Sequence, residues 1–121
     1  MSDNNSSAVQ KLIAKDHIRE LVYLYSQAVT TKDTDLMVSL YVQNASFGSL
    51  GSGEKALRSM MDKTMGDLEF AVILIANHTI SFENSELANG EVWARCYAQN
   101  GSEGYYEQLI KYVDQYQVTD H

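Results

Sequence analysis

The segment 70–83, FAVILIANHTISFE, changes its hydrophobic pattern half way along its length. Its first half is continuously apolar, and its second half alternates between apolar and polar residues, as a strand with one buried face does. The apolar parity of the second half consists of Ala76, His78, Ile80 and Phe82. The pattern predicts a central strand whose buried face carries one histidine. A titratable ring among apolar neighbours is either a hydrogen-bonded core residue or part of a functional site.

Three segments before this strand have the spacing of amphipathic helices. Residues 8–31 repeat apolar residues at intervals of three and four, which predicts a long helix with one buried stripe. Asp33 or Thr34 can cap a second, shorter helix over 35–42. A further helix is expected over 54–65, where apolar residues again recur at helical spacing.

The rest of the chain predicts strands and turns. Residues 44–50 are interpreted as a short strand, and 91–99 and 105–118 as two longer ones that follow the central strand. The strongest turn signal is the pair Asn89–Gly90, within a turn expected over 84–89. Helices followed by a meander of three long strands predict an α+β fold, with an antiparallel sheet and helices gathered on one face.

Composition limits the chain to one ordinary globular domain. Its 121 residues and 13.6 kDa suffice for a single core. A hydrophobic content of 45% and a charged content of 21% are typical of soluble proteins. We expect residues 1–7 to be a disordered tail and residues 8–121 to form the domain.

Net charge indicates which partners are excluded, and the cysteine content indicates the redox compartment. A net charge of -7 repels phosphate backbones and anionic headgroups, so neither nucleic acid nor a membrane surface is expected as a partner. The lone Cys96 cannot form an internal disulfide, which suits a reducing cytoplasm. The three histidines, His17, His78 and His121, show no ligand spacing on one element, so we expect neither a metal nor another cofactor.

The last predicted strand places a carboxylate among aromatic rings. Asp114 has the same parity as Tyr112 and Tyr116, whereas the other parity is mostly polar. A carboxylate on an apolar face needs a partner. A pairing with Arg95 or Lys111 would make Asp114 structural, and a partner in a pocket would make it functional.

Several segments together resemble the SnoaL-like branch of the nuclear-transport-factor-2-like superfamily. They are the opening helix HIRELVYLYSQAV, the corner TTKDTDL, the segment SLYVQNASF, the pair Asn77–His78, and KYVDQY in the last strand. The resemblance implies a cone-shaped curved sheet around a cavity that the helices partly close, often in a dimer formed through the sheet. Members of this group include dehydratases, dehydrochlorinases, ketosteroid isomerases, polyketide cyclases and plain binding modules, so the fold alone does not define the chemistry. Relatives usually continue into one more strand after the last turn, and its apparent absence here is expected to leave an exposed sheet edge.

The resemblance also implies candidate catalytic residues. His78 matches a histidine that, in the dehydratase-like members, works with an aspartate at the end of the first helix, but Thr30 stands at that aspartate's position. Tyr25 and Asp114 match two hydrogen-bond donors of the ketosteroid isomerases, whose base would fall near Ser49. Both catalytic patterns are therefore incomplete in this chain.

If His78, Tyr25 and Asp114 converge, they can perform proton-transfer chemistry. An imidazole can take a proton from carbon next to a carbonyl, and hydrogen-bond donors can hold the resulting enolate. Asp114 would act either as a protonated donor or as a carboxylate that orients His78. We expect a cofactor-independent lyase or isomerase for a small organic molecule; the alternative is a non-catalytic ligand-binding or dimerisation module, which Thr30 favours. The expected pocket residues are Thr30, Tyr41, Phe47, Met60, Ile80 and Tyr112.

Overall fold

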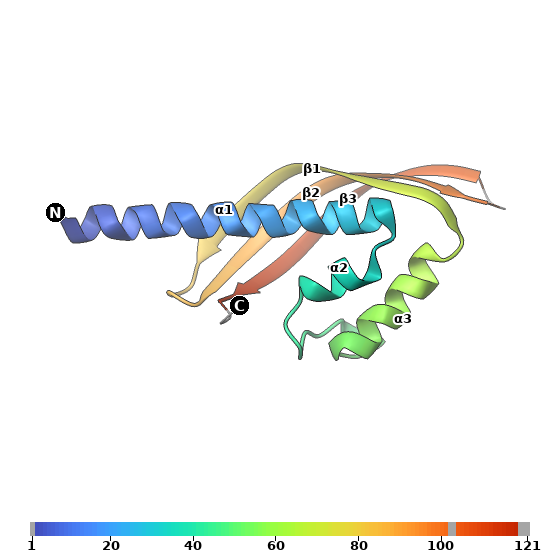
Figure 1. Ribbon diagram of the computed structural model, residues 1–121. Helices are drawn as coiled ribbons and strands as arrows, with labels where there is room; N and C mark the ends of the chain where they lie inside the picture. The colour runs from blue at the N-terminus through green and yellow to red at the C-terminus, as the bar shows by residue number, and fades with distance from the viewer. Residues whose placement is uncertain (1, 102–103, 119–121) are drawn as a thin grey trace.

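The computed structural model describes residues 2–101 and 104–118, and shows three helices followed by three strands (Figure 1). His121, one of the three histidines considered above, lies outside the described residues. The helices lie on one side of the sheet, and the sheet bends over them (Figure 1). The elements are α1 (Ser2–Thr31), α2 (Thr34–Ser39), α3 (Gly53–Met65), β1 (Leu68–Phe82), β2 (Leu87–Asn100) and β3 (Gly104–Gln117).

The strands form one antiparallel sheet in the order β1-β2-β3, as expected for a meander. The predicted α+β class, with a sheet covered on one face by helices, is confirmed. None of the described helices is long and apolar enough to cross a membrane.

A β-bulge at Ala76 divides β1 into two halves. Before the bulge, odd-numbered residues face the helices: Ile73 is 5% exposed and lies opposite the buried Cys96. After the bulge, even-numbered residues take that face, and His78 lies opposite Val92, which is 1% exposed. A bulge adds one residue to a strand and re-aims the side chains that follow it. Ala76 itself is exposed, so our expectation that it shares the buried face with His78 is wrong.

The main hydrophobic core lies between the helices and one end of the sheet. Burial of one large apolar side chain typically stabilises a fold by about 1.5–3 kcal/mol, and Leu57 of α3 is 1% exposed in the middle of this cluster. The cluster consists of Ala28, Val29, Met37, Leu57, Met61, Met65, Leu68, Ala71, Ile73, Ala94, Cys96 and Ala98.

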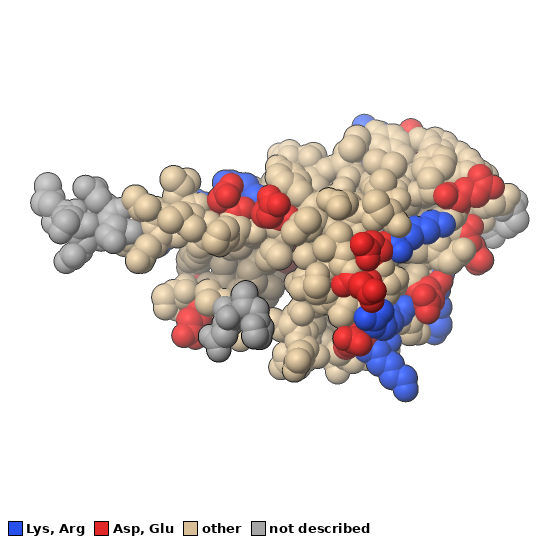
Figure 2. Space-filling model, in the orientation of Figure 1, with Lys and Arg blue, Asp and Glu red and all other residues tan. Residues whose placement is uncertain are grey.

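Local capping and ion pairing hold the small helices in place. Asp33 accepts a hydrogen bond from the backbone N–H of Leu36 at 3.0 Å, which confirms it as the cap of α2. Arg58 of α3 pairs with Asp35 of α2 at 2.9 Å and with Glu54 at 3.2 Å. Charged side chains of both signs gather over this part of the surface in Figure 2. The pair with Asp35 links α2 to α3, whereas the pair with Glu54 lies within α3. Exposed ion pairs of this kind contribute little stability.

The start of the first helix differs from expectation. The helix begins at Ser2, so it includes most of the segment that we expected to be a tail. The polar composition of residues 2–7 did not predict this, because a polar helix has no apolar stripe to reveal its period.

The predicted strand over 44–50 is wrong. In the structure, Ser46 forms only an isolated bridge with Ser52, and Gly48–Leu50 form a short 3₁₀ helix. Gly48 and Gly51 have positive φ angles of 61° and 100°, which turn the chain instead of extending it.

The turn expected over 84–89 is confirmed in its first part, because β1 ends at Phe82 and β2 begins at Leu87. The turn signal at Asn89–Gly90 is wrong, because both residues lie inside β2. The reversal occurs at residues 83–86, where Asn84 makes an Asx turn. Its side-chain oxygen accepts hydrogen bonds from the backbone N–H groups of Glu86 at 2.8 Å and Leu87 at 3.0 Å.

Candidate functional site

A hydrogen-bonded chain of three side chains lies on the inner face of the sheet, beyond the main core. The Nε2 atom of His78 is 3.1 Å from the hydroxyl oxygen of Tyr116, and that hydroxyl donates to Oδ2 of Asp114 at 3.0 Å. His78 is on β1, whereas the other two residues are on β3, and all three are half-buried. The structure therefore brings His78 and Asp114 together, but through Tyr116.

Gly90 allows this chain to form. A Cβ atom built on Gly90 would lie 2.6 Å from Cε2 of Tyr116, so any larger residue at position 90 would have to displace the ring. The signal for this contact is present in the sequence, because Tyr116 has the same parity as Asp114. The alternation along the last strand places Tyr116 on that face but indicates no role for it, and the Asn-Gly pair favoured a turn at Gly90.

Tyr25 and Tyr112 form a second polar pair beside the first. The hydroxyl of Tyr25, on α1, donates to the hydroxyl of Tyr112, on β3, at 3.1 Å, and their rings meet edge to face at 5.4 Å. Tyr112 and Asp114 follow one another on the inner face of β3, so the two polar groups are neighbours.

Four phenols around Asp114 are kept in their protonated form. Burial is the main cause that raises the pKa of Tyr25, Tyr112 and Tyr116, and it raises the pKa of Tyr41 to about 12. The negative charge of Asp114 raises all four pKa values further. These hydroxyls are therefore hydrogen-bond donors at neutral pH.

His78 is a neutral imidazole near pH 7. Burial lowers its pKa below the ordinary value of 6.5, and Arg19 lowers it further, while the charge of Asp114 acts in the opposite direction. A neutral imidazole has one nitrogen that can accept a proton.

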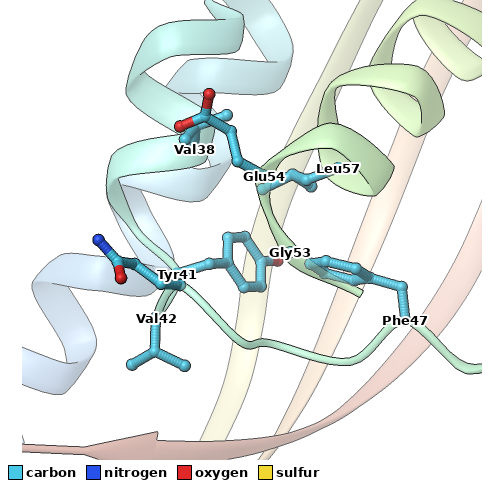
Figure 3. Close-up of a pocket in the computed structure, with 8 residues that line it drawn as sticks. Val38, Tyr41, Val42, Phe47, Gly53, Glu54 and Leu57 are labelled. Atoms are coloured by element: carbon cyan, nitrogen blue, oxygen red, sulfur yellow. The ribbon is translucent and has the colours of Figure 1, made fainter. Parts of the chain in front are cut away.

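A pocket of about 320 Å³ lies between α2, the segment that follows it and the start of α3, and Figure 3 shows the residues that line it. Two residues expected in a pocket, Tyr41 and Phe47, line it with rings that meet edge to face at 5.4 Å. His78 and Asp114 do not line this pocket. Tyr41 connects the two regions, since its ring borders the pocket and the charge of Asp114 acts on its hydroxyl. The pocket is lined by Val38, Tyr41, Val42, Gln43, Phe47, Gly53, Glu54 and Leu57.

Thr30 lies apart from His78. The hydroxyl of Ser26 donates to the backbone carbonyl of Ile73, which fixes the position of α1 along β1. Because α1 and β1 run in opposite directions (Figure 1), Thr30, one turn beyond Ser26, lies towards the start of β1. His78 is five residues from Ile73 in the other direction, or roughly 16 Å along an extended strand. Thr30 is exposed at the end of α1 and does not join the cluster.

The two remaining expected pocket residues are divided between the regions. Met60 of α3 packs against the main core. Ile80 is half-buried on β1, opposite Gly90, next to the polar cluster. Among the residues that the structure describes, no three His, Cys, Asp or Glu side chains are grouped to hold a metal ion.

The two bases that might have neutralised Asp114 lie elsewhere. Arg95 pairs with Glu107 at 3.6 Å and Lys111 pairs with Glu91 at 3.4 Å. Arg95 and Lys111 have the opposite parity to Asp114 on their strands, so these pairs lie on the outer face of the sheet. The structural pairing that the sequence left open is therefore not formed.

A curved antiparallel sheet with three helices on its inner face defines a cone-shaped α+β protein, and a half-buried polar cluster lies on that inner face. The chain belongs to the SnoaL-like domain family, whose model matches residues 10–121. The resemblance inferred from the sequence is thus confirmed.

Solved structures agree on the fold. A provisionally assigned scytalone dehydratase from Novosphingobium aromaticivorans superposes with a TM-score of 0.84 at 16% identity, covering 93% of this chain and 79% of that one. The LinA type 3 hexachlorocyclohexane dehydrochlorinase from Novosphingobium barchaimii gives 0.84 at 13%, covering 93% and 82%. A provisionally assigned dehydratase of the nuclear-transport-factor-2-like family from Streptomyces avermitilis gives 0.72 at 11%, covering 87% and 86%. Identities this low show the fold alone. A comparison with curated protein sequences gave no match.

Proposed function

We propose that this protein is a cofactor-independent lyase or isomerase that transfers a proton of a small organic molecule, with His78 as the base. The observation that carries the proposal is the hydrogen-bonded chain from His78 through Tyr116 to Asp114 on a half-buried face. A lone core histidine would be satisfied by one partner. Here the partner is itself fixed by a carboxylate, which is the arrangement expected of an oriented base.

The substrate class follows from the groups around the base. A neutral imidazole can take a proton from carbon next to a carbonyl, and phenols with raised pKa values can donate hydrogen bonds to the enolate oxygen. Tyr112 is suited to donate to the enolate oxygen, because its hydroxyl oxygen accepts a hydrogen bond from Tyr25 and its own hydroxyl proton remains free to donate. If a β-hydroxyl group leaves, the protonated His78 returns its proton to it as water, so no cofactor is consumed.

The pocket in Figure 3 would hold the apolar part of such a substrate. Its wall includes Tyr41, Phe47 and Leu57, and the charge of Asp114 acts on the Tyr41 hydroxyl. The names of the similar structures, dehydratase and dehydrochlorinase, describe losses of water and of hydrogen chloride, and each of these losses removes a proton, which fits a site with a base.

The proposal is tested by proton exchange in D₂O. β-Tetralone, a ketone with acidic protons beside its carbonyl, is incubated with wild type, His78→Gln and His17→Gln, and deuterium uptake is followed by NMR. Loss of a general base lowers rates by about 10²–10⁴-fold, so His78→Gln should slow the catalysed exchange by this factor. His17→Gln, an identical change on the exposed side of α1, should have no effect.

A binding module is the second candidate, and the position of Thr30 favours it. The acid expected at the end of the first helix is missing, and that position lies far from His78. Equal exchange rates for wild type, His78→Gln and the uncatalysed reaction, together with binding of β-tetralone seen by calorimetry, would support the module and contradict the enzyme.

We also propose that two copies associate through the outer face of the sheet. That face exposes large apolar side chains: Leu109 is 70% exposed and Val113 is 74% exposed. The Nζ atom of Lys111 lies over the ring of Trp93, 5.8 Å from its centroid. Exposed apolar patches of this kind often mark interfaces. Val113→Glu should convert a dimer to a monomer in sedimentation equilibrium, whereas a wild type that is already monomeric would contradict the proposal.

A further inference from the structure

We propose that Asp114, acting through the hydroxyl of Tyr116, selects the tautomer of His78, so that Nδ1 is the nitrogen that accepts the substrate proton. Tyr116 and Asp114 are thus positioning residues for the base. This inference rests on the proposed function, since it names which atom of His78 performs the reaction, but the tautomer itself can be measured without a substrate.

The single proton of the Tyr116 hydroxyl decides the tautomer of His78. The Tyr116 hydroxyl has one proton, and it donates that proton to Oδ2 of Asp114 at 3.0 Å. The contact between the same hydroxyl and Nε2 of His78, at 3.1 Å, then requires a proton on Nε2. A neutral imidazole carries one proton, so Nδ1 keeps its lone pair.

The fold holds the three groups in this order. The bulge at Ala76 turns His78 towards the inner face, and Gly90 leaves room for the ring of Tyr116. The His78 and Tyr116 rings lie 6.0 Å apart between centroids, with 56° between their planes, so they meet through their polar edges and do not stack. Loss of the bulge, or a larger residue at position 90, would separate the imidazole of His78 from the hydroxyl of Tyr116.

The order has a chemical consequence. When Nδ1 takes a proton, the imidazolium still donates from Nε2 to Tyr116, which still donates to Asp114. The positive charge is therefore stabilised by a carboxylate two hydrogen bonds away, without any transfer of the phenolic proton. Arg19 of α1 is the charged group that opposes this stabilisation.

The decisive experiment compares two substitutions of Asp114 by long-range ¹H–¹⁵N NMR of the imidazole, in the full chain without ligand. Asp114→Asn keeps an oxygen that accepts from Tyr116, so His78 should keep its proton on Nε2. Asp114→Leu removes the acceptor, so the Tyr116 hydroxyl should donate to Nε2 instead and move the proton of His78 to Nδ1. Both substitutions remove the charge of Asp114, so a difference in tautomer between the two variants can arise only from the hydrogen-bond acceptor that Asn keeps and Leu lacks.

Two results would overturn the inference. One is a wild type whose His78 carries its proton on Nδ1; the other is an Asp114→Leu spectrum with the proton still on Nε2. If Asp114→Leu does not fold, Tyr116→Phe serves instead, because it removes the acceptor of the Nε2 proton. That proton should then exchange with water at least tenfold faster than in wild type, and an unchanged exchange rate would equally contradict the proposal.

A second measurement separates this inference from the proposed function. If His78 is the base, Asp114→Asn should slow the β-tetralone exchange, because the charge that stabilises the imidazolium is lost. Asp114→Leu should lose at least tenfold more than Asp114→Asn, in parallel with the tautomer. A tautomer that switches as expected with no activity in wild type would retain the positioning chain and reject the enzyme. Activity that is equal in the two variants despite different tautomers would reject the role of Nδ1.

Discussion

The two ends of the inner sheet face have different surroundings. At the end covered by α2 and α3, small strand residues such as Ala94 and Ala98 are fully buried under large helix residues such as Leu57. At the other end, the buried apolar residues are fewer, and half-buried polar groups lie among them. These buried residues are Ile18 and Val22 of α1 with Ala88 and Val92 of β2.

The difference shows how one sheet serves both stability and chemistry. Apolar packing needs close contact from several elements, and the core end has three helices around it. At the site end, imidazole, carboxylate and phenols are half-buried, and hydrogen bonds between them compensate for lost water. The imidazole and the phenols held in this way have shifted pKa values, whereas filling the same space with aliphatic residues would add stability and remove these groups.

The two ends of the inner sheet face should contribute unequally to the free energy of unfolding. Leu57→Ala should lower the free energy of unfolding by about 2–5 kcal/mol, because it leaves a cavity in the core. Ile80→Ala, at the half-buried site end, should cost only about 1 kcal/mol. Urea unfolding of both variants measures the difference, and a larger loss for Ile80→Ala would contradict this division.

The contact between Gly90 and Tyr116 can be tested in isolation. Gly90→Ala places a methyl group against the Tyr116 ring, so we expect a loss of about 1–3 kcal/mol in unfolding free energy from overpacking. The same substitution in a Tyr116→Ala background should cost almost nothing, since the clash is gone. If the losses in unfolding free energy of Gly90→Ala and Tyr116→Ala are additive, a contact other than the Tyr116 ring requires glycine at position 90.

The smallest expected effect is the pH dependence of stability at the site. The pKa of His78 is lowered from 6.5 in the folded protein, so between the folded pKa and 6.5 the unfolded chain binds more protons than the folded one. Stability should therefore fall as pH drops below 6.5 towards the folded pKa, and the fall should be complete below it. In His78→Gln this part of the slope should disappear from urea unfolding measured across that range, while His17→Gln should retain it; the reverse pattern would place the titration elsewhere.

Much of the fold was predictable because it depends on patterns of neighbouring residues. The helical spacing over 8–31, the cap at Asp33 and the alternation over 105–118 depend only on neighbouring residues, and each corresponds to an element of the structure. The same parity placed His78 and Asp114 on the inner face. The strand expected over 44–50 failed because glycines at positive φ outweighed its apolar residues.

The link between His78 and Asp114 was not predictable, since it depends on contacts between distant strands. Tyr116 belonged to the correct parity, but nothing local shows that its hydroxyl reaches both groups. Gly90 was assigned to a turn because Asn-Gly pairs favour turns, although its actual role is to accommodate a ring from another strand.

By itself, the sequence determined which residues are apolar, where helices and strands form, and which side chains share a face of each strand. Only the tertiary structure decided that the bulge at Ala76 changes the parity within β1, and that one tyrosine joins a histidine to a carboxylate. The physical reason is range: periodicity and capping act over a few residues, whereas register, close approach and hydrogen bonding between strands are set by the packed molecule as a whole.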